Sequence, residues 1–559
     1  MNFSQNNQPL YPKATSWWID TLFLCIVLGS LFFIMLGIRP LFTPDEGRYA
    51  EIAREMVASG DYVTPYLNSI KYFEKPIFFY WLGALSIKIG GLNIGSLRSI
   101  NGLLGLIGCL LTYFTARQLY GRKTGLLSAL ILGTSILYFV MAHTISLDLP
   151  VTVFLSATLY ACLLGAEEPN TRKSWFFFLA ASVAAALAVL TKGLIGIVFP
   201  AMIVGAWIIL MQEWRLLKPS LLLSCLLIFL IVAAPWHIIV GMRNPEFFYF
   251  YFIEQHFLRY ATMDIGHYQP IWFFIPCLIL GFFPWIVFLP QTICASLPSS
   301  FKNLSAKRTE LFFLLWAIII FAFFSFSKSK LIPYILPVIP PLSILTARYL
   351  ANLQKVSKFF IVSFVALTLI AITIAYTFYL HIQYGILADP IKAKYYLTLA
   401  ASVLVAGTFI TLIISHNKNT SISMLIITMW FFLLIALASI PSIDTRTIRP
   451  LAMALKPMLK PQDDVITYNR YYQDLPFYLE RRISILNWQN ELTFGMQHQQ
   501  TDDWMINNQT FWQRWHSNRR VYLFLGSDDY QSLQKNHTKE TFYLLNKTSN
   551  NVLISNQKP

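Results

Sequence analysis

Apolar stretches of about 20 residues recur along this chain, and they constrain its fold more than any other feature of the sequence. A stretch of that length forms a helix that can span the hydrocarbon core of a bilayer. The chain has 559 residues, of which 56% are hydrophobic and only 13% are charged. A soluble protein of this size needs far more charge to cover its surface. The sequence therefore predicts a polytopic α-helical membrane protein.

Hydropathy predicts thirteen membrane spans. They lie near residues 17–38, 98–118, 124–142, 147–166, 175–191, 193–212, 219–240, 271–293, 310–327, 331–351, 358–380, 395–415 and 421–440. A shorter apolar segment, 77–91, is expected to lie along the interface or to re-enter the membrane. The first span is longer than a signal-peptide core and no cleavage pattern follows it, so we interpret it as a retained anchor.

Basic residues indicate the orientation of these spans. They gather in short loops, for example at Arg122 and Lys123, and the positive-inside rule places such loops in the cytoplasm. The opposite loops 39–97 and 241–270 then face outward, and the second is expected to form an aromatic helix in the headgroup layer. The same loop bias explains the net charge of +16, so no nucleic-acid partner is expected.

The composition becomes polar near residue 441. Residues 1–440 are predicted to form the transmembrane domain, and residues 441–559 a small α/β domain on the outer side. Two segments of the second domain, DDVITY and RRVYLFLG, have the residue types of strands.

Two charged motifs follow apolar segments at the predicted outer face. TPDEGRY contains an acidic pair and Arg48, and YFEKP contains a glutamate–lysine pair. Each motif has a structural interpretation: Thr43 or Asp45 can cap a helix, and Glu74 with Lys75 can anchor the interface. An acidic cluster beside arginine at a membrane exit is costly unless it is solvated or used, which favours a functional role.

Further polar side chains lie in the other predicted outer loops. Asp148 occurs in SLDLP, Lys192 in TKG and Tyr334 in SKSKLIPY, while EQHFLRY adds His256 and Arg259. Basic residues from several loops would form a phosphate-binding rim around an acidic centre. A lone histidine such as His256 is more often structural than a ligand.

These motifs resemble those of one known family. FTPDEGRYAEIAREM, FEKPIFFYWL, SLDLP, TKG, EQHFLRY and SKSKLIPYILPVIPPLS occur in this order through most of residues 17–350. In this the chain resembles the lipid A aminoarabinose transferases, which belong with the protein O-mannosyltransferases to the GT-C membrane glycosyltransferases. One departure is Ile77, where the family usually has a second proline; it could alter the start of the interfacial helix.

The resemblance implies a GT-C fold of thirteen helices with a periplasmic C-terminal domain, in the bacterial inner membrane. It implies that an undecaprenyl-phosphate-linked sugar is the donor, that lipid A is the acceptor and that transfer inverts the anomeric carbon. The catalytic residues would be Asp45, Asp148 and Glu74. The donor phosphate would contact Lys75, Arg48, Arg259, Lys192, Tyr72 and Tyr334. The resemblance also implies a divalent metal, such as zinc, at Glu74 and His256.

Two alternatives stay open at this point. A protein O-mannosyltransferase, or another transferase of the same fold, would need Asp45 as a true general base for a serine or threonine acceptor. A transporter of lipid-linked sugars would carry charges inside its spans and have two related halves. The sequence has neither feature, since its charges gather on one face.

Overall fold

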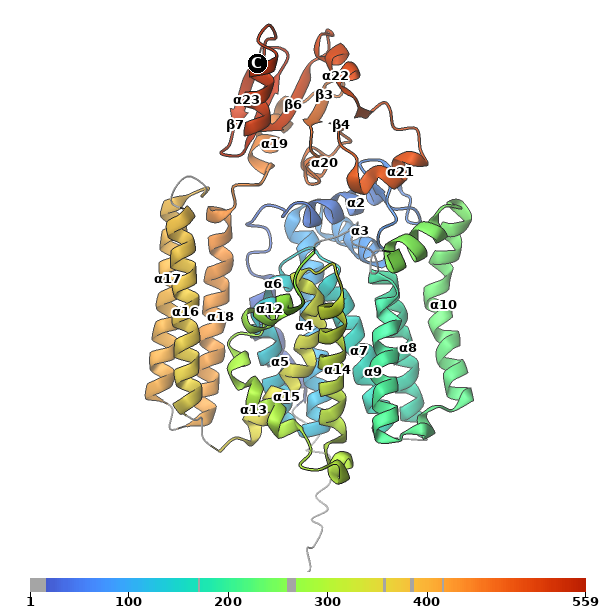
Figure 1. Ribbon diagram of the computed structural model, residues 1–559, viewed down its shortest axis with the longest axis vertical. Helices are drawn as coiled ribbons and strands as arrows, with labels where there is room; N and C mark the ends of the chain where they lie inside the picture. Colours follow the sequence, from blue (N-terminus) through green and yellow to red (C-terminus); the bar gives the residue numbers. More distant parts are fainter. Residues whose placement is uncertain are drawn as a thin grey trace, which may run out of the picture.

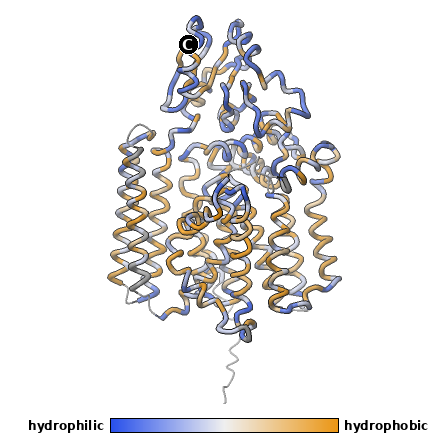
Figure 2. The backbone as a smooth tube through the Cα atoms, viewed as in Figure 1, coloured by the Kyte–Doolittle hydropathy of each residue, from blue (hydrophilic) through white to orange (hydrophobic). Residues whose placement is uncertain are grey.

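Long helices form most of this computed structural model, and a small sheet domain lies at one end of them (Figure 1). The structure describes residues 17–168, 171–258, 268–354, 358–382, 387–414 and 417–558. Figure 2 shows hydrophobic residues along the long helices and hydrophilic residues in the sheet domain. The predicted class, a polytopic α-helical membrane protein with a small C-terminal α/β domain, is confirmed.

Eight of the described helices are long and apolar enough to cross a membrane. They are α4 (Ile94–Tyr120), α7 (Asp148–Glu167), α8 (Arg172–Lys192), α10 (Pro219–Arg243), α14 (Arg308–Phe326), α15 (Ile339–Asn352) with the turn Ile332–Val338 before it, α17 (Pro390–Ile413) and α18 (Lys418–Ile443). Two bent pairs raise the number to ten if each pair is one span. These pairs are α5 (Arg122–Thr134) with α6 (Ile136–Ala142), and α12 (Phe274–Gly281) with α13 (Leu289–Ser296).

Three further apolar helices, which are not among these eight to ten, decide the total number of spans. They are α1 (Trp17–Phe33), α9 (Ile195–Met211) and α16 (Lys358–Ile382). Thirteen spans are reached only if all three cross, so that number stays a prediction. Helix α3 (Phe78–Gly90) has 13 residues, too few to span a bilayer. It lies with α2 across the end of the helix bundle (Figure 1), as expected for a segment along the interface.

Helix α2 (Asp45–Ser59) begins where the sequence indicates, but its predicted cap is wrong. No side chain caps the helix, because Pro44 occupies the N-cap position and has no side-chain acceptor. The backbone N–H of Glu46 instead donates to the carbonyl of Phe42 at 2.9 Å. The helix ends at Gly60, whose left-handed backbone (φ 73°) lets its N–H reach the carbonyl of Met56. A short hairpin, β1 (Tyr66–Leu67) and β2 (Ile70–Lys71), connects α2 to α3.

The C-terminal domain is built on a six-stranded sheet with the order β5-β4-β3-β6-β8-β7. The strands are β3 (Asp464–Tyr468), β4 (Ser484–Leu486), β5 (Met505–Ile506), β6 (Val521–Gly526), β7 (Tyr543–Lys547) and β8 (Asn551–Ser555). Strands β5, β4, β3 and β6 are parallel, and β8 and β7 complete the sheet antiparallel. Strands β3 and β6 are the two predicted from the sequence. The helices are α19 (Arg449–Leu455), α20 (Leu475–Leu479), α21 (Thr493–Gln497), α22 (Asn508–Trp515) and α23 (Ser527–Asn536).

This domain packs directly on α2. A Cβ added at Gly47 would lie 2.6 Å from the backbone nitrogen of Asp474, so the close approach of α2 to the start of α20 requires glycine. The Leu41 N–H donates to the Tyr478 hydroxyl at 3.0 Å. The first outer loop and the C-terminal domain therefore share one interface.

The predicted aromatic helix forms as a π-helix, η2 (Tyr249–Leu258). Its position differs from a helix lying only in the headgroup layer. The Phe250 ring stacks on Phe494 of α21 with centroids 3.8 Å apart, and Phe247 packs edge-on against Phe73. The segment therefore fills the space between the first outer loop and the C-terminal domain.

Candidate active site

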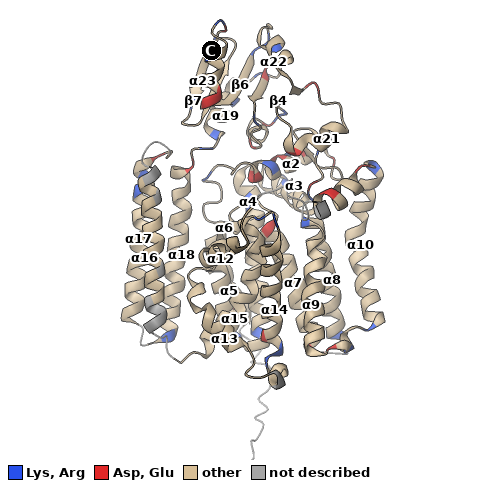
Figure 3. Cartoon of the chain, viewed as in Figure 1, with Lys and Arg blue, Asp and Glu red and all other residues tan. Residues whose placement is uncertain are grey.

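Charged side chains gather around α2 and at the opposite ends of the helices, with few between (Figure 3). Asp148 and Lys192 form one pair at the α2 end. Asp148 is the first residue of α7 and Lys192 the last of α8, so each helix dipole favours the charge at its end. The two side chains form an ion pair, and the ammonium lies 4.8 Å from the centre of the Tyr334 ring. Three residues predicted from separate loops are thus in contact.

Arg48 is the centre of a second group. Its guanidinium forms an ion pair with Asp45 at 3.1 Å and another with Glu491 of the C-terminal domain. Burial alone would lower the pKa of Arg48, but electrostatic interactions with Tyr72 and Glu491 raise it above its ordinary value. The side chain of Asp45 is 52% exposed, whereas that of Arg48 is 14% exposed. Arg48 is therefore a fixed cation with one accessible carboxylate beside it.

Two buried tyrosines lie next to Arg48. The hydroxyls of Tyr72 and Tyr80 have no hydrogen-bond partner among the described residues. Burial raises the pKa of Tyr72, and the Arg48 charge opposes this while Glu74 adds to it. Both hydroxyls are therefore protonated donors near neutral pH. Glu74 and Lys75 are half-buried and directly precede α3.

Tyr49 interacts electrostatically with both groups, the Asp148–Lys192 pair and the residues around Arg48. Burial raises its pKa, and the carboxylates of Asp45 and Asp148 raise it further. Both carboxylates are therefore within electrostatic reach of one ring, which packs edge-on against Phe79. The residues predicted at 45, 48, 72, 148, 192 and 334 lie in one region of the fold.

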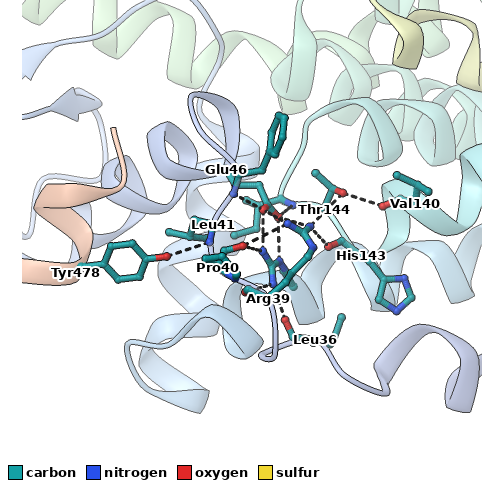
Figure 4. Close-up of polar contacts among 12 residues, drawn as sticks. Leu36, Arg39, Pro40, Leu41, Glu46, Val140, His143, Thr144 and Tyr478 are labelled. Carbon is teal, nitrogen blue, oxygen red and sulfur yellow. Dashed lines mark hydrogen bonds and ion pairs between the residues drawn. The ribbon is translucent and has the colours of Figure 1, made fainter. Parts of the chain in front are cut away.

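Glu46, which the sequence interpretation passed over, is the centre of a fully buried ionic network (Figure 4). Its carboxylate accepts from Arg39 at 2.6 and 3.0 Å and from Arg98 at 2.7 and 2.9 Å. The backbone N–H groups of Phe42 and Ile145 donate to it as well, both at 2.8 Å. Burial alone would raise the pKa of Glu46, but the two guanidinium groups hold it at about 2.

This network fixes the two loops that carry Asp45 and Asp148. Arg98 comes from α4 and also donates to the carbonyls of Leu36 and Pro40, which precede α2. Arg39 also donates to the carbonyl of His143 at 2.7 Å, in the loop before Asp148. An arginine inside an otherwise apolar helix, as at Arg98, was the signal in the sequence that could have revealed the network.

Two of the basic residues expected in a phosphate-binding rim, Lys192 and Arg48, already have acidic neighbours in the structure. Lys192 pairs with Asp148, and Arg48 pairs with Asp45 and Glu491. Glu491 lies in the C-terminal domain, and its part in the site was not predicted from the sequence. A bound phosphate would therefore have to exchange places with carboxylates.

Two predicted site residues cannot be placed. Arg259 lies outside the described residues, as does the side chain of His256. A metal held by Glu74 and His256 accordingly stays a prediction. Across the described ranges, no group of three histidine, cysteine or acidic side chains could hold a metal ion.

Known proteins match both parts of the chain. The family model described as dolichyl-phosphate-mannose-protein mannosyltransferase matches residues 17–251, and that of the aminoarabinose transferase C-terminal domain matches residues 451–556. The undecaprenyl phosphate-alpha-4-amino-4-deoxy-L-arabinose arabinosyl transferase 1 of Proteus mirabilis is 36% identical over 344 residues. That match covers 60% of this chain and 61% of the relative, so the sequence similarity spans less than two thirds of the relative's length.

Solved structures extend the likeness to the whole chain. The crystal structure of ArnT from Cupriavidus metallidurans bound to undecaprenyl phosphate is 27% identical, with a TM-score of 0.83. It covers 97% of this chain and 99% of that one. The same protein in the apo state gives a TM-score of 0.81 over 98% and 99%. The chain therefore has the architecture of ArnT over nearly its whole length.

Proposed function

We propose that this protein transfers 4-amino-4-deoxy-L-arabinose from undecaprenyl phosphate to phosphate groups of lipid A, at the periplasmic face of the bacterial inner membrane. The main support is the likeness to ArnT bound to undecaprenyl phosphate, which extends over 99% of that chain. The ion pairs Asp45–Arg48 and Asp148–Lys192 lie within electrostatic reach of one ring, that of Tyr49, and would surround a lipid headgroup.

The reaction makes one bond and breaks one. An oxygen of the lipid A phosphate attacks the anomeric carbon, and the bond from that carbon to the undecaprenyl phosphate oxygen breaks with its electron pair. Attack from the opposite side inverts the anomeric carbon. The acceptor phosphate, with a second pKa of about 6, is mostly dianionic at neutral pH. The nucleophile then needs no proton removed, and catalysis depends on positioning and charge stabilisation.

The cationic groups would stabilise the departing phosphate. Lys192 and Arg48 pair with Asp148 and Glu491 before substrate binds, and the departing phosphate would replace these carboxylates as the partner of the two cations. The hydroxyls of Tyr72 and Tyr80 point to no other partner among the described residues and are available as hydrogen-bond donors.

The carboxylates would orient the sugar and the acceptor. Asp45 is half-exposed, so a charged acceptor headgroup can reach it from the aqueous side. Its negative charge complements the protonated amino group of the aminopentose. Asp148 is more enclosed, and its second oxygen accepts from the Ser146 hydroxyl at 3.0 Å.

Mass spectrometry of lipid A tests this proposal. A bacterial strain without its own lipid A aminopentose transferase would express the wild-type chain or Asp148→Asn. Lipid A from the wild-type strain should gain one aminopentose per modified phosphate, and the variant should lose most of this product. Unmodified lipid A in the presence of well-expressed wild-type protein and donor would contradict the proposal.

The match of residues 17–251 to the protein mannosyltransferase model supports one alternative function. A protein O-mannosyltransferase would place its sugar on serine or threonine, and Asp45 would then be the leading candidate for the base. Loss of such a base typically costs about 10²–10⁴-fold in rate. Sugar on an exported protein, with none on lipid A, would favour this alternative.

A further inference from the structure

The C-terminal domain contains a cavity that the transfer site described above does not use. It has a volume of about 440 Å³. Pockets of roughly 300–1,000 Å³ are typical for small ligands. The cavity lies at the carboxyl ends of the parallel strands β4 and β5, since Asn487 and Trp488 directly follow β4 and Asn507 directly follows β5. In open sheets with parallel strands, this edge is the usual place for a ligand.

The lining of the cavity indicates the chemistry of the ligand. Asn487, Gln489 and Asn507 line the cavity with side-chain amides. The Asn487 amide nitrogen donates to Asn508 and the Asn507 oxygen accepts from the Thr510 N–H, so their other amide atoms and the Gln489 amide would meet a ligand. Trp488 adds a half-buried aromatic surface and Asp502 one carboxylate. Among the described residues, no lysine, arginine or histidine lines the cavity. Amides with one aromatic face suit a hydroxyl-rich ring with an apolar C–H face, and the absence of cations disfavours a phosphate.

One short segment connects this cavity to the transfer site. Residues 487–489 line the cavity, and Glu491, two residues later, forms the ion pair with Arg48. Met496 also lines the cavity, while its neighbour Gly495 packs against the backbone of Lys71 in the first outer loop. A ligand in the cavity would thus contact the same segment whose Glu491 pairs with Arg48.

We infer that this cavity is a carbohydrate subsite that holds a headgroup sugar of the acceptor glycolipid while its phosphate is at the transfer site. The inference rests on the proposed function for the identity of the glycolipid. It assigns Trp488 to stacking on the sugar ring and Gln489 to hydrogen bonding with its hydroxyls. The C-terminal domain would then contribute to acceptor recognition as well as to the position of Arg48.

A binding measurement on the purified full-length chain tests the subsite. The probe is the water-soluble headgroup oligosaccharide released from lipopolysaccharide by removal of its acyl chains, observed by saturation-transfer NMR. The wild type should bind it, and Trp488→Ala and Gln489→Ala should each weaken binding by about tenfold. Trp214→Ala, which changes an exposed tryptophan in the turn between α9 and α10, is the matched control and should bind normally. Inorganic phosphate should not displace the probe.

A kinetic measurement separates this inference from the proposed function. With saturating donor, Trp488→Ala should raise KM for lipopolysaccharide about tenfold and leave kcat unchanged, because the lost contact is the same in ground and transition states. Probe binding that depends on Trp488, without any transfer to lipid A, would support the subsite and contradict the proposed function. Normal probe binding and normal KM in both Trp488→Ala and Gln489→Ala, or displacement of the probe by phosphate, would overturn the subsite.

Discussion

Asp45 and Glu46 are adjacent and chemically alike, yet the fold gives them different roles. Asp45 is half-exposed and pairs with Arg48 at the proposed transfer site. Glu46 is fully buried between Arg39 and Arg98 and also accepts from two backbone N–H groups. A helix rotates about 100° per residue, so the side chains of neighbouring residues on α2 point in different directions. The first residue can serve chemistry because the second fixes the helix.

Replacing Glu46 with glutamine tests its structural role. Glu46→Gln leaves two buried guanidinium groups without a counter-charge, and breaking a buried ion pair costs about 3–5 kcal/mol. We expect a clearly lower Tm in detergent. Glu168→Gln breaks a more exposed ion pair with Lys173 and should change stability by less than about 1 kcal/mol. Equal Tm values for the two variants would contradict the role of Glu46.

Replacing Lys75 tests whether this residue is needed for transfer. It is half-buried immediately before α3, near the residues that surround Arg48. Lys75→Ala should abolish transfer while expression and Tm stay near those of the wild type. The control is Lys88→Ala, which replaces an exposed lysine in the last turn of α3 and should retain activity. Near-normal turnover by Lys75→Ala would remove Lys75 from the site.

At the scale of secondary-structure elements, the contact between α2 and α20 contains a buried carboxyl group. Asp474 is fully buried, and neither of its oxygens has a hydrogen-bond partner among the described residues. Burial, with smaller contributions from Asp444 and Glu46, raises the pKa of Asp474 to about 8. The carboxyl is therefore neutral at the interface near neutral pH.

The raised pKa predicts a pH dependence with a definite sign. The unfolded chain releases this proton near pH 3.8, whereas the folded protein retains it to about pH 8. Stability therefore falls as pH rises through this range. Asparagine has no proton to lose, so Asp474→Asn should raise Tm relative to the wild type, and by more at pH 8 than at about pH 5. Asp528→Asn, an exposed change, should give no such trend, and a pH-independent difference for Asp474→Asn would be evidence against the account.

The sequence predicted the elements better than the contacts between them. Asp45, Asp148 and Lys192 were identified because each charge directly borders an apolar segment, a local pattern. Glu491 and Asp474 could not be identified, because their partners on α2, Arg48 and Gly47, lie more than 400 residues away along the chain. Helix α2 was predicted with Thr43 or Asp45 as its cap, and this cap is wrong because Pro44 occupies the N-cap position and supplies no side-chain acceptor.

One end of the whole molecule contains both α2 and the C-terminal domain (Figure 1), and hydrophilic residues are frequent in that domain (Figure 2). The proposed orientation puts this end in the periplasm. On a background without the native cysteines, Ser59→Cys and Ser517→Cys are exposed there and should react with an impermeant thiol reagent in intact spheroplasts. Ser220→Cys, exposed at the start of α10 near the opposite end, should react only after permeabilisation. The reverse pattern would contradict the proposed orientation.

Reconstituted transfer is the most direct test of the central claim. The purified chain in lipid nanodiscs would receive undecaprenyl phosphate carrying labelled 4-amino-4-deoxy-L-arabinose, together with lipid A and a serine-containing peptide. We expect label on lipid A phosphate for the wild type. We expect little for Asp45→Asn, with no recovery at alkaline pH, because a phosphate nucleophile is already ionised. Label on the peptide, or no label on lipid A with active donor present, would contradict the account.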